Sequence, residues 1–173
     1  MDHYLKLAKD TVEIFIKTNQ IPPLPKDLPS EILEKKAGAF VSIHQKSGEL
    51  RGCIGTFLPT KPNLALEIIT NAISSATQDP RFPPLTEEEL DNLTYSVDIL
   101  SSPKPATKKQ INPKKYGLIV TAEDGRKGLL LPDLPGVETS EQQIAICRQK
   151  AGIGPQEKVE FQIFTVARHG EIK

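Results

Sequence analysis

Residues 39–57, AFVSIHQKSGELRGCIGTF, decide how this chain folds. Apolar and polar residues alternate on both sides of a central Lys-Ser-Gly-Glu tetrapeptide, whose composition is typical of a tight turn. The pattern therefore predicts a β-hairpin in which Ser42 lies opposite Cys53 and His44 opposite Arg51. Side-chain alternation divides this hairpin into a core face with Val41, Ile43, Leu50 and Ile54 and a polar face with Ser42, His44, Arg51 and Cys53.

The segments around the hairpin show helical and strand periodicities in turn. Before it, Asp2 can cap a first helix, and the proline-rich residues 21–29 form a stiff connector because proline lacks an N–H group. After it, apolar spacing predicts a helix over residues 60–76 and a strand over residues 93–100. The first half of the chain therefore mixes helices with hairpin-connected strands.

The same order of hairpin, helix and strand recurs in the second half of the chain. A strand, a turn, a strand, a helix and a strand are predicted over residues 116–121, 123–126, 127–131, 139–151 and 159–166. We therefore expect a single domain over residues 1–173, with a first repeat at about 37–102 and a second at about 115–168. In the second repeat, Leu129 occupies the strand position that Cys53 occupies in the first.

Composition excludes some classes of function. Lys and Arg together number 22, and so do Asp and Glu, so the chain has no net charge to attract nucleic acid or anionic lipid. It also lacks an apolar stretch long enough to cross a membrane and a leader-like start. We expect a cytoplasmic protein that binds neither generic nucleic acid nor membranes, and two cysteines without paired spacing fit a reducing compartment.

Cys53 is the candidate nucleophile of the hairpin. A guanidinium beside it, from Arg51, would lower the pKa of the thiol, and the imidazole of His44 on the neighbouring strand could accept the proton. These three residues are the candidate catalytic group.

The glycines of the second hairpin strand point to a binding role. A glycine inside a strand usually marks a bulge or the close approach of a backbone or a ligand, so Gly52, Ile54 and Gly55 are candidate binding residues. The alternative is that both glycines serve a bend of a curled sheet and that Cys53 is a small apolar residue under a covering helix. The leucines at 129–131 of the second repeat indicate that the fold alone does not demand small residues here.

Asp79 and Arg81 form a second constellation, in a loop bounded by prolines. Two opposite charges at this spacing either clamp a charged ligand or hold the turn, and both are kept as candidate binding residues. Cys147 shares an apolar helical stripe with Ile144 and is interpreted as core. Metal-ligand spacings and glycine-rich phosphate loops are missing, so we expect no metal site, and the sequence leaves any cofactor unknown.

Four sequence blocks resemble the AMMECR-domain family, and in particular its prokaryotic branch. The run Leu50-Arg51-Gly52-Cys53-Ile54-Gly55 is similar to the family's hexapeptide signature, and it is joined by the blocks DPRFPPLT at 79–86, YGL at 116–118 and GLLLP at 128–132. The resemblance implies an α+β fold with two unequal lobes, flanking helices and a barrel-like, mainly antiparallel sheet. It also implies a cleft that bears the signature.

The resemblance leaves the molecular function unsettled. It implies possible association with a Memo-like protein and a radical-SAM enzyme, whose genes often accompany those of the prokaryotic branch. We favour a binding or accessory protein whose cleft at residues 51–55 takes a small molecule, a peptide or a protein partner, because no third group that would orient His44 can be named. The alternative is an enzyme or redox component that uses Cys53 as its thiol.

Overall fold

The chain forms two compact units of unequal length. In the computed structural model, which describes residues 2–170, unit 1 extends through Leu100 and takes in the chain again from Ala167, and unit 2 is Ser101–Val166. Each unit combines helices with a four-stranded sheet, and the strand pairings described are antiparallel. The α+β class expected from the sequence is confirmed. The ends of the predicted domain, Met1 and residues 171–173, lie outside the described residues.

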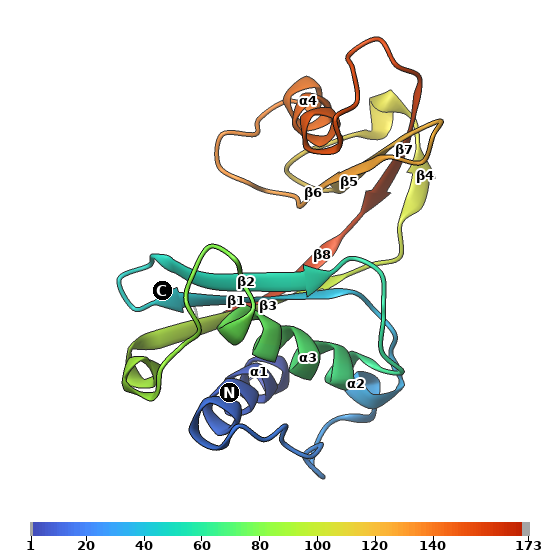
Figure 1. Cartoon of the computed structure of the whole chain (residues 1–173). Helices are drawn as coiled ribbons and strands as arrows, with labels where there is room; N and C mark the ends of the chain where they lie inside the picture. The colour runs from blue at the N-terminus through green and yellow to red at the C-terminus, as the bar shows by residue number, and fades with distance from the viewer. Residues whose placement is uncertain (1, 171–173) are drawn as a thin grey trace. The chain divides into compact units, whose positions relative to one another are not determined.

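Unit 1 is a sheet whose helices lie on one side (Figure 1). Its strands follow the order β2-β1-β3-β8. The elements are α1 (His3–Thr18), α2 (Ser30–Glu34), β1 (Ala39–Gln45), β2 (Leu50–Thr56), α3 (Leu64–Thr77), the 3-10 helix η1 (Glu87–Asn92), β3 (Leu93–Leu100) and β8 (Val166–Gly170).

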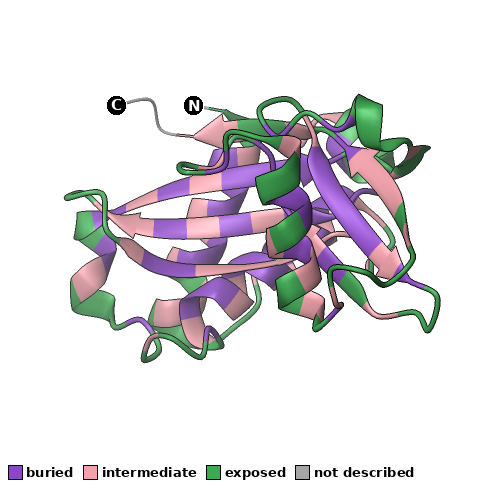
Figure 2. Ribbon diagram, turned by 90° about the horizontal axis from the view of Figure 1, so that it is seen from above, coloured by how far each residue is buried: buried purple, intermediate pink, exposed green. Residues whose placement is uncertain are grey.

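Local sequence explains where the unit-1 helices begin. The carboxylate of Asp2 accepts hydrogen bonds from the first free N–H groups of α1, as predicted, and Asn63 caps α3 in the same way. Both helices cover the sheet with buried apolar side chains that meet every second residue of β1 and β3. Figure 2 shows the resulting alternation of buried and intermediate residues along the strands.

The β1–β2 hairpin departs from the predicted register near its turn. Ser42 pairs with Cys53 as predicted, but His44 pairs with Leu50, so that Arg51 is the extra residue of a β-bulge. The bulge reverses the expected faces: Arg51 is 8% exposed, and Leu50 is half-buried. Ile54 is also only half-buried, because β2 is the edge strand of its sheet.

Unit 2 also combines a four-stranded sheet with a helix, and its strands are shorter. Its strands follow the order β4-β7-β5-β6, and α4 packs on β5 and β6. The elements are β4 (Lys104–Ala106), the 3-10 helix η2 (Lys108–Gln110), β5 (Gly117–Ala122), β6 (Lys127–Leu130), α4 (Ser140–Ala151) and β7 (Val159–Phe164). The sequence missed β4, and the strand predicted over 159–166 ends at Phe164 because Thr165 exchanges hydrogen bonds with Ser101 instead.

The two units share more than their order of elements. In each, the first hairpin strand pairs with the strand that follows the helix, giving β2-β1-β3 and β6-β5-β7. A Cβ added to Gly52 would come within 2.2 Å of the Ser75 carbonyl oxygen, and one added to Gly128 within 1.8 Å of that of Cys147. The internal repeat and its boundaries stay a prediction. The barrel-like closure is not confirmed, since the strands form two sheets.

Candidate functional site

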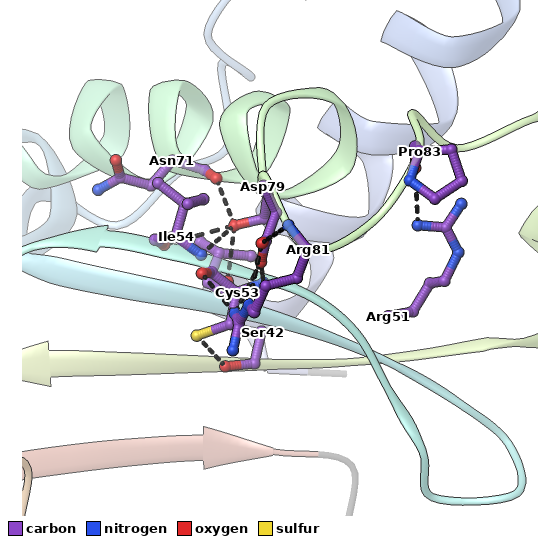
Figure 3. A network of polar contacts seen from close by, with 10 residues as sticks. Ser42, Arg51, Cys53, Ile54, Asn71, Asp79, Arg81 and Pro83 are labelled. Atoms are coloured by element: carbon purple, nitrogen blue, oxygen red, sulfur yellow. Dashed lines mark hydrogen bonds and ion pairs between the residues drawn. The ribbon is translucent and has the colours of Figure 1, made fainter.

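Cys53 lies in the middle of β2, in a row of small polar side chains that crosses three strands. Its pairing partner on β1 is Ser42, and the partner of Ser42 on β3 is Ser96. The hydroxyl of Ser42 donates a hydrogen bond to the Cys53 sulfur at 3.1 Å (Figure 3). All three residues are half-buried, so the row is reachable from solvent.

This row belongs to the side of the unit-1 sheet that faces away from α1 and α3, which we call the polar face. Strand alternation and the side-chain contact of Arg168 define its members: Phe40, Ser42, His44, Cys53, Thr94, Ser96, Asp98 and Arg168. Asp98, 5% exposed, accepts two hydrogen bonds from the half-exposed guanidinium of Arg168, at 2.7 and 2.8 Å. A buried carboxylate thus fixes the position of a partly exposed cation.

The Asp79–Arg81 pair holds both the turn and the main chain of Cys53. Asp79, whose side chain is 2% exposed, accepts hydrogen bonds from the Arg81 N–H and guanidinium and from the Cys53 N–H at 2.9 Å. Arg81 also donates to the Cys53 carbonyl at 3.4 Å. The N–H and C=O of one residue point to the same edge of a strand, so the pair occupies the outer edge of β2 at Cys53. We call this arrangement the edge clasp (Figure 3).

Arg51 does not lie beside the thiol, contrary to the prediction. Its guanidinium donates to Glu89 at 2.7 and 3.1 Å and to the carbonyl of Pro83 at 2.9 Å. Figure 3 shows its side chain extending toward Pro83, away from Cys53. The cause is the bulge, which turns Arg51 to the helix side of the sheet. Arg51 therefore joins β2 to the loop that carries the second sequence block.

The electrostatic surroundings of Cys53 disfavour a thiolate. Burial raises the pKa of Cys53, and the hydrogen bond from Ser42 and the charge of Arg81 only partly oppose this effect. Asp98 and Asp79 raise the pKa further by charge repulsion. The sequence-based argument for a lowered pKa is therefore wrong, and the cation that acts on the thiol is Arg81.

His44 reaches the polar face as predicted. It lies two residues from Ser42 on β1, and its partners on either side are Leu50 and Thr94. It is thus a diagonal neighbour of Cys53, a separation of about 7–8 Å between backbones that a long side chain can span. Its role as a base stays a prediction.

The two glycines of the signature face protein atoms. Helix α3 approaches β2 at Gly52 so closely that its backbone leaves no room for a Cβ. At Gly55 the space is taken by the ring of Phe40, 2.3 Å from where a Cβ would lie. Close approach by the protein itself accounts for both glycines, and ligand binding by Gly52, Ile54 and Gly55 stays a prediction.

Sequence reasoning missed several polar residues that build this region. Ser75 of α3 donates to the Val41 carbonyl at 2.7 Å and accepts from the Ile54 N–H at 2.8 Å, so its hydroxyl bridges β1 and β2. Glu67, fully buried, accepts hydrogen bonds from Thr60, Lys61 and Thr56 and so fixes the loop after β2. The sequence marks Ser75 and Glu67 only as polar residues on an otherwise apolar helix. Asp98 is marked in the same way, as an acidic residue on an otherwise apolar strand.

The remaining candidate residues form no further centre. Cys147 is fully buried, which confirms its interpretation as a core residue, and burial raises the pKa of its thiol to about 11. Within residues 2–170, His, Cys, Asp and Glu form no group of three or more that could hold a metal ion. No helix in the same range is long and apolar enough to cross a membrane.

Comparisons with known proteins give the chain its family. A protein of Thermotoga maritima is 49% identical over 168 residues, which are 96% of this chain and 96% of that protein. A protein of Clostridium acetobutylicum is 44% identical over 171 residues, 98% of this chain but 36% of that longer protein. The names of these relatives state no activity.

A solved structure agrees with the sequence relatives. The crystal structure of an uncharacterised protein from Pyrococcus horikoshii matches with a TM-score of 0.83 and 34% identity, over 95% of this chain and 88% of that one. The model of the AMMECR1 family matches residues 5–169. The resemblance noted in the sequence is thereby confirmed: the chain belongs to the AMMECR1 family.

Proposed function

We propose that the protein is a binding or accessory protein that takes a small polar molecule or peptide on the polar face of unit 1. The observation that carries this proposal is the row Cys53–Ser42–Ser96, three hydrogen-bonding side chains in register on a sheet face that packs against neither α1 nor α3. Antiparallel sheets commonly have one face packed on the core and one solvated face, and the polar face is the solvated face of this sheet. Small, half-buried hydroxyl and thiol groups are suited to direct hydrogen bonds with a ligand.

The framework around this row supports binding because it is already in place. The edge clasp fixes the main chain at Cys53, and the Arg51–Glu89 pair fixes the bulge two residues earlier. Arg168, paired with Asp98, places a half-exposed guanidinium at the other end of the face. A ligand with a carboxylate or phosphate and neighbouring hydrogen-bonding groups matches this arrangement, and a preorganised site binds it with little loss of entropy.

The alternative function is an enzyme that uses Cys53 as its nucleophile. The half-buried thiol and the nearby charge of Arg81 favour it, whereas burial and the two carboxylates oppose formation of the thiolate. The raised pKa of Cys53 makes binding the better-supported function. Under either function, the free thiols of Cys53 and Cys147 agree with our proposal of a cytoplasmic location.

A further polypeptide belongs to this proposal. The Clostridium relative matches this chain over 36% of its own length, so there the domain is part of a larger protein. We therefore propose that the protein works together with a second polypeptide. The Memo-like and radical-SAM proteins implied by the resemblance are the first to test.

The proposal is tested by what the purified protein retains. The full chain and its Ser96→Leu variant are purified in parallel and denatured, and the released small molecules are compared by mass spectrometry, with Lys109→Gln in unit 2 as the control. We expect a compound that the control retains and Ser96→Leu loses, because the leucine covers the polar row. A compound retained equally by all three would contradict the proposal, and a covalent adduct on Cys53 would favour the enzyme.

A further inference from the structure

Unit 2 carries a groove of about 510 Å³ along α4, within the size range of small-molecule sites. Its apolar lining combines helix, loop and strand residues: Ile144, Ala145, Ile153, Pro155 and Phe161. The residues that line it all belong to unit 2, so it is separate from the polar face of unit 1.

The groove exists because the chain after α4 is held away from the helix. Gly152 ends α4 in the left-handed conformation, with φ 65°, which turns the chain back. Arg148 then donates hydrogen bonds from Nη1 to the carbonyls of Gly154 at 2.6 Å and Glu157 at 3.0 Å. The following loop is thereby fixed as the second wall, and Ile153, 5% exposed, packs beneath it.

Charge at the groove favours an anion. Within the described residues, Nε and Nη2 of Arg148 have no hydrogen-bond acceptor, although Nη1 is anchored. Lys108, on η2, contributes a second cation to the lining, and Glu141 is the single carboxylate. A guanidinium fixed through one nitrogen presents its other donors in a geometry that matches the two oxygens of a carboxylate.

We propose that this groove binds a small organic carboxylate with an apolar chain or ring. The carboxylate pairs with Nε and Nη2 of Arg148 and is attracted by Lys108. The apolar part covers Ala145, Pro155 and Phe161, and its removal from water supplies the rest of the affinity. A neutral apolar compound would contact only the apolar lining of the groove, and an inorganic anion would contact only Arg148 and Lys108.

The test uses octanoate as the probe and 1-octanol as its uncharged counterpart. Each is titrated into the ¹⁵N-labelled full chain while the amide resonances are followed by NMR. We expect octanoate, at about 5 mM, to shift the resonances of α4 and of the loop after it, because a ligand of millimolar affinity is then largely bound. Octanol should bind at least about fivefold more weakly, because it forms no charge-assisted hydrogen bond.

Variants locate the site. Ala145 is exposed on α4, so Ala145→Trp fills the groove without entering the core and should weaken octanoate binding at least about tenfold. Lys108→Gln should weaken it about two- to fivefold, and Lys109→Gln, its neighbour outside the groove, should leave it unchanged. Unchanged binding by Ala145→Trp, equal binding of octanol, or shifts confined to unit 1 would each overturn the proposal.

Discussion

Replacing Asp79 by asparagine should destabilise unit 1, and the structure sets the size of the effect. The carboxylate has four partners: the Cys53 N–H at 2.9 Å, the Arg81 N–H and Nε at 3.0 Å each, and Arg81 Nη2 at 2.7 Å. All four are donors. Each oxygen accepts two of them, so an asparagine must turn its own NH₂ group toward two donors, whichever way its amide is placed.

The loss in free energy of unfolding should be about 2–4 kcal/mol. Two effects contribute to this loss. Donors are left without an acceptor, and Arg81 loses its charge-assisted hydrogen bonds to residue 79, whose side chain is 2% exposed. The matched control is Asp124→Asn, because Asp124 makes the same i, i+2 contacts with Arg126 at a site where its side chain is 58% exposed. That variant should leave the unfolding midpoint almost unchanged, since exposed pairs contribute little.

Urea unfolding followed by circular dichroism measures both variants, and the exchange of the Cys53 amide hydrogen reports on the clasp itself. The hydrogen bonds from Arg81 hold the pKa of Asp79 far below its ordinary value in the folded protein. Its contribution is therefore fully present above the unfolded pKa of about 4 and is lost as the pH falls through the folded pKa. The wild-type advantage should be constant between about pH 8 and 5 and shrink in stronger acid. Equal destabilisation by the two variants would refute this account of the clasp.

Three other changes test the remaining contacts. Iodoacetamide should label Cys53 faster than the fully buried Cys147, and Arg81→Met should slow the labelling of Cys53 because it removes the charge that lowers the thiol pKa. Mass spectrometry of tryptic peptides measures the labelling of both cysteines. Faster labelling of Cys147 would contradict the assignment of Cys53 to the polar face. Gly52→Ala should lower the free energy of unfolding by about 1–3 kcal/mol, since its Cβ would meet the α3 backbone at 2.2 Å, and an unchanged urea midpoint would show that the helix yields freely. Glu67→Gln should destabilise by about 1–3 kcal/mol at pH 7, because the donors around its buried carboxylate must then face an NH₂ group. Glu67 has a lowered pKa, so this difference should narrow as the pH falls below its unfolded value of about 4.3, and a difference that widened in acid would exclude the mechanism.

Local sequence was sufficient for most of the helices and strands and for much of the core, although it missed β4. The alternation of residues 39–45 correctly predicted that Val41 and Ile43 are buried, and Asp2 was correctly identified as the cap of α1. These features depend on residues within one turn or one strand of each other. Helical periodicity likewise placed Cys147 in the core.

The site could not be predicted to the same degree because distant contacts decide it. Regular alternation put Arg51 beside Cys53, but one bulged residue reverses the face, and the partner that stabilises the bulge, Glu89, is 38 positions away. The cation that does act on Cys53, Arg81, is 28 positions away in a loop. The Arg51–Glu89 and Arg81–Cys53 contacts join residues from different segments, so the spacing of residues along the sequence does not predict them. Two of the four sequence blocks that carry the family resemblance, residues 50–55 and 79–86, were found separately, and only the structure shows that they bond to each other.

The edge clasp also bears on how copies of this chain behave toward one another. An edge strand with bare amide and carbonyl groups is a template on which a second molecule can add a strand, and β2 is such an edge. Asp79 and Arg81 fill the outward positions of Cys53, so an incoming strand would have to displace an ion pair before it could pair there. Strong acid removes that obstacle by protonating Asp79. Two side chains thus hinder the addition of a strand to β2 at Cys53, which is the kind of contact from which fibres grow.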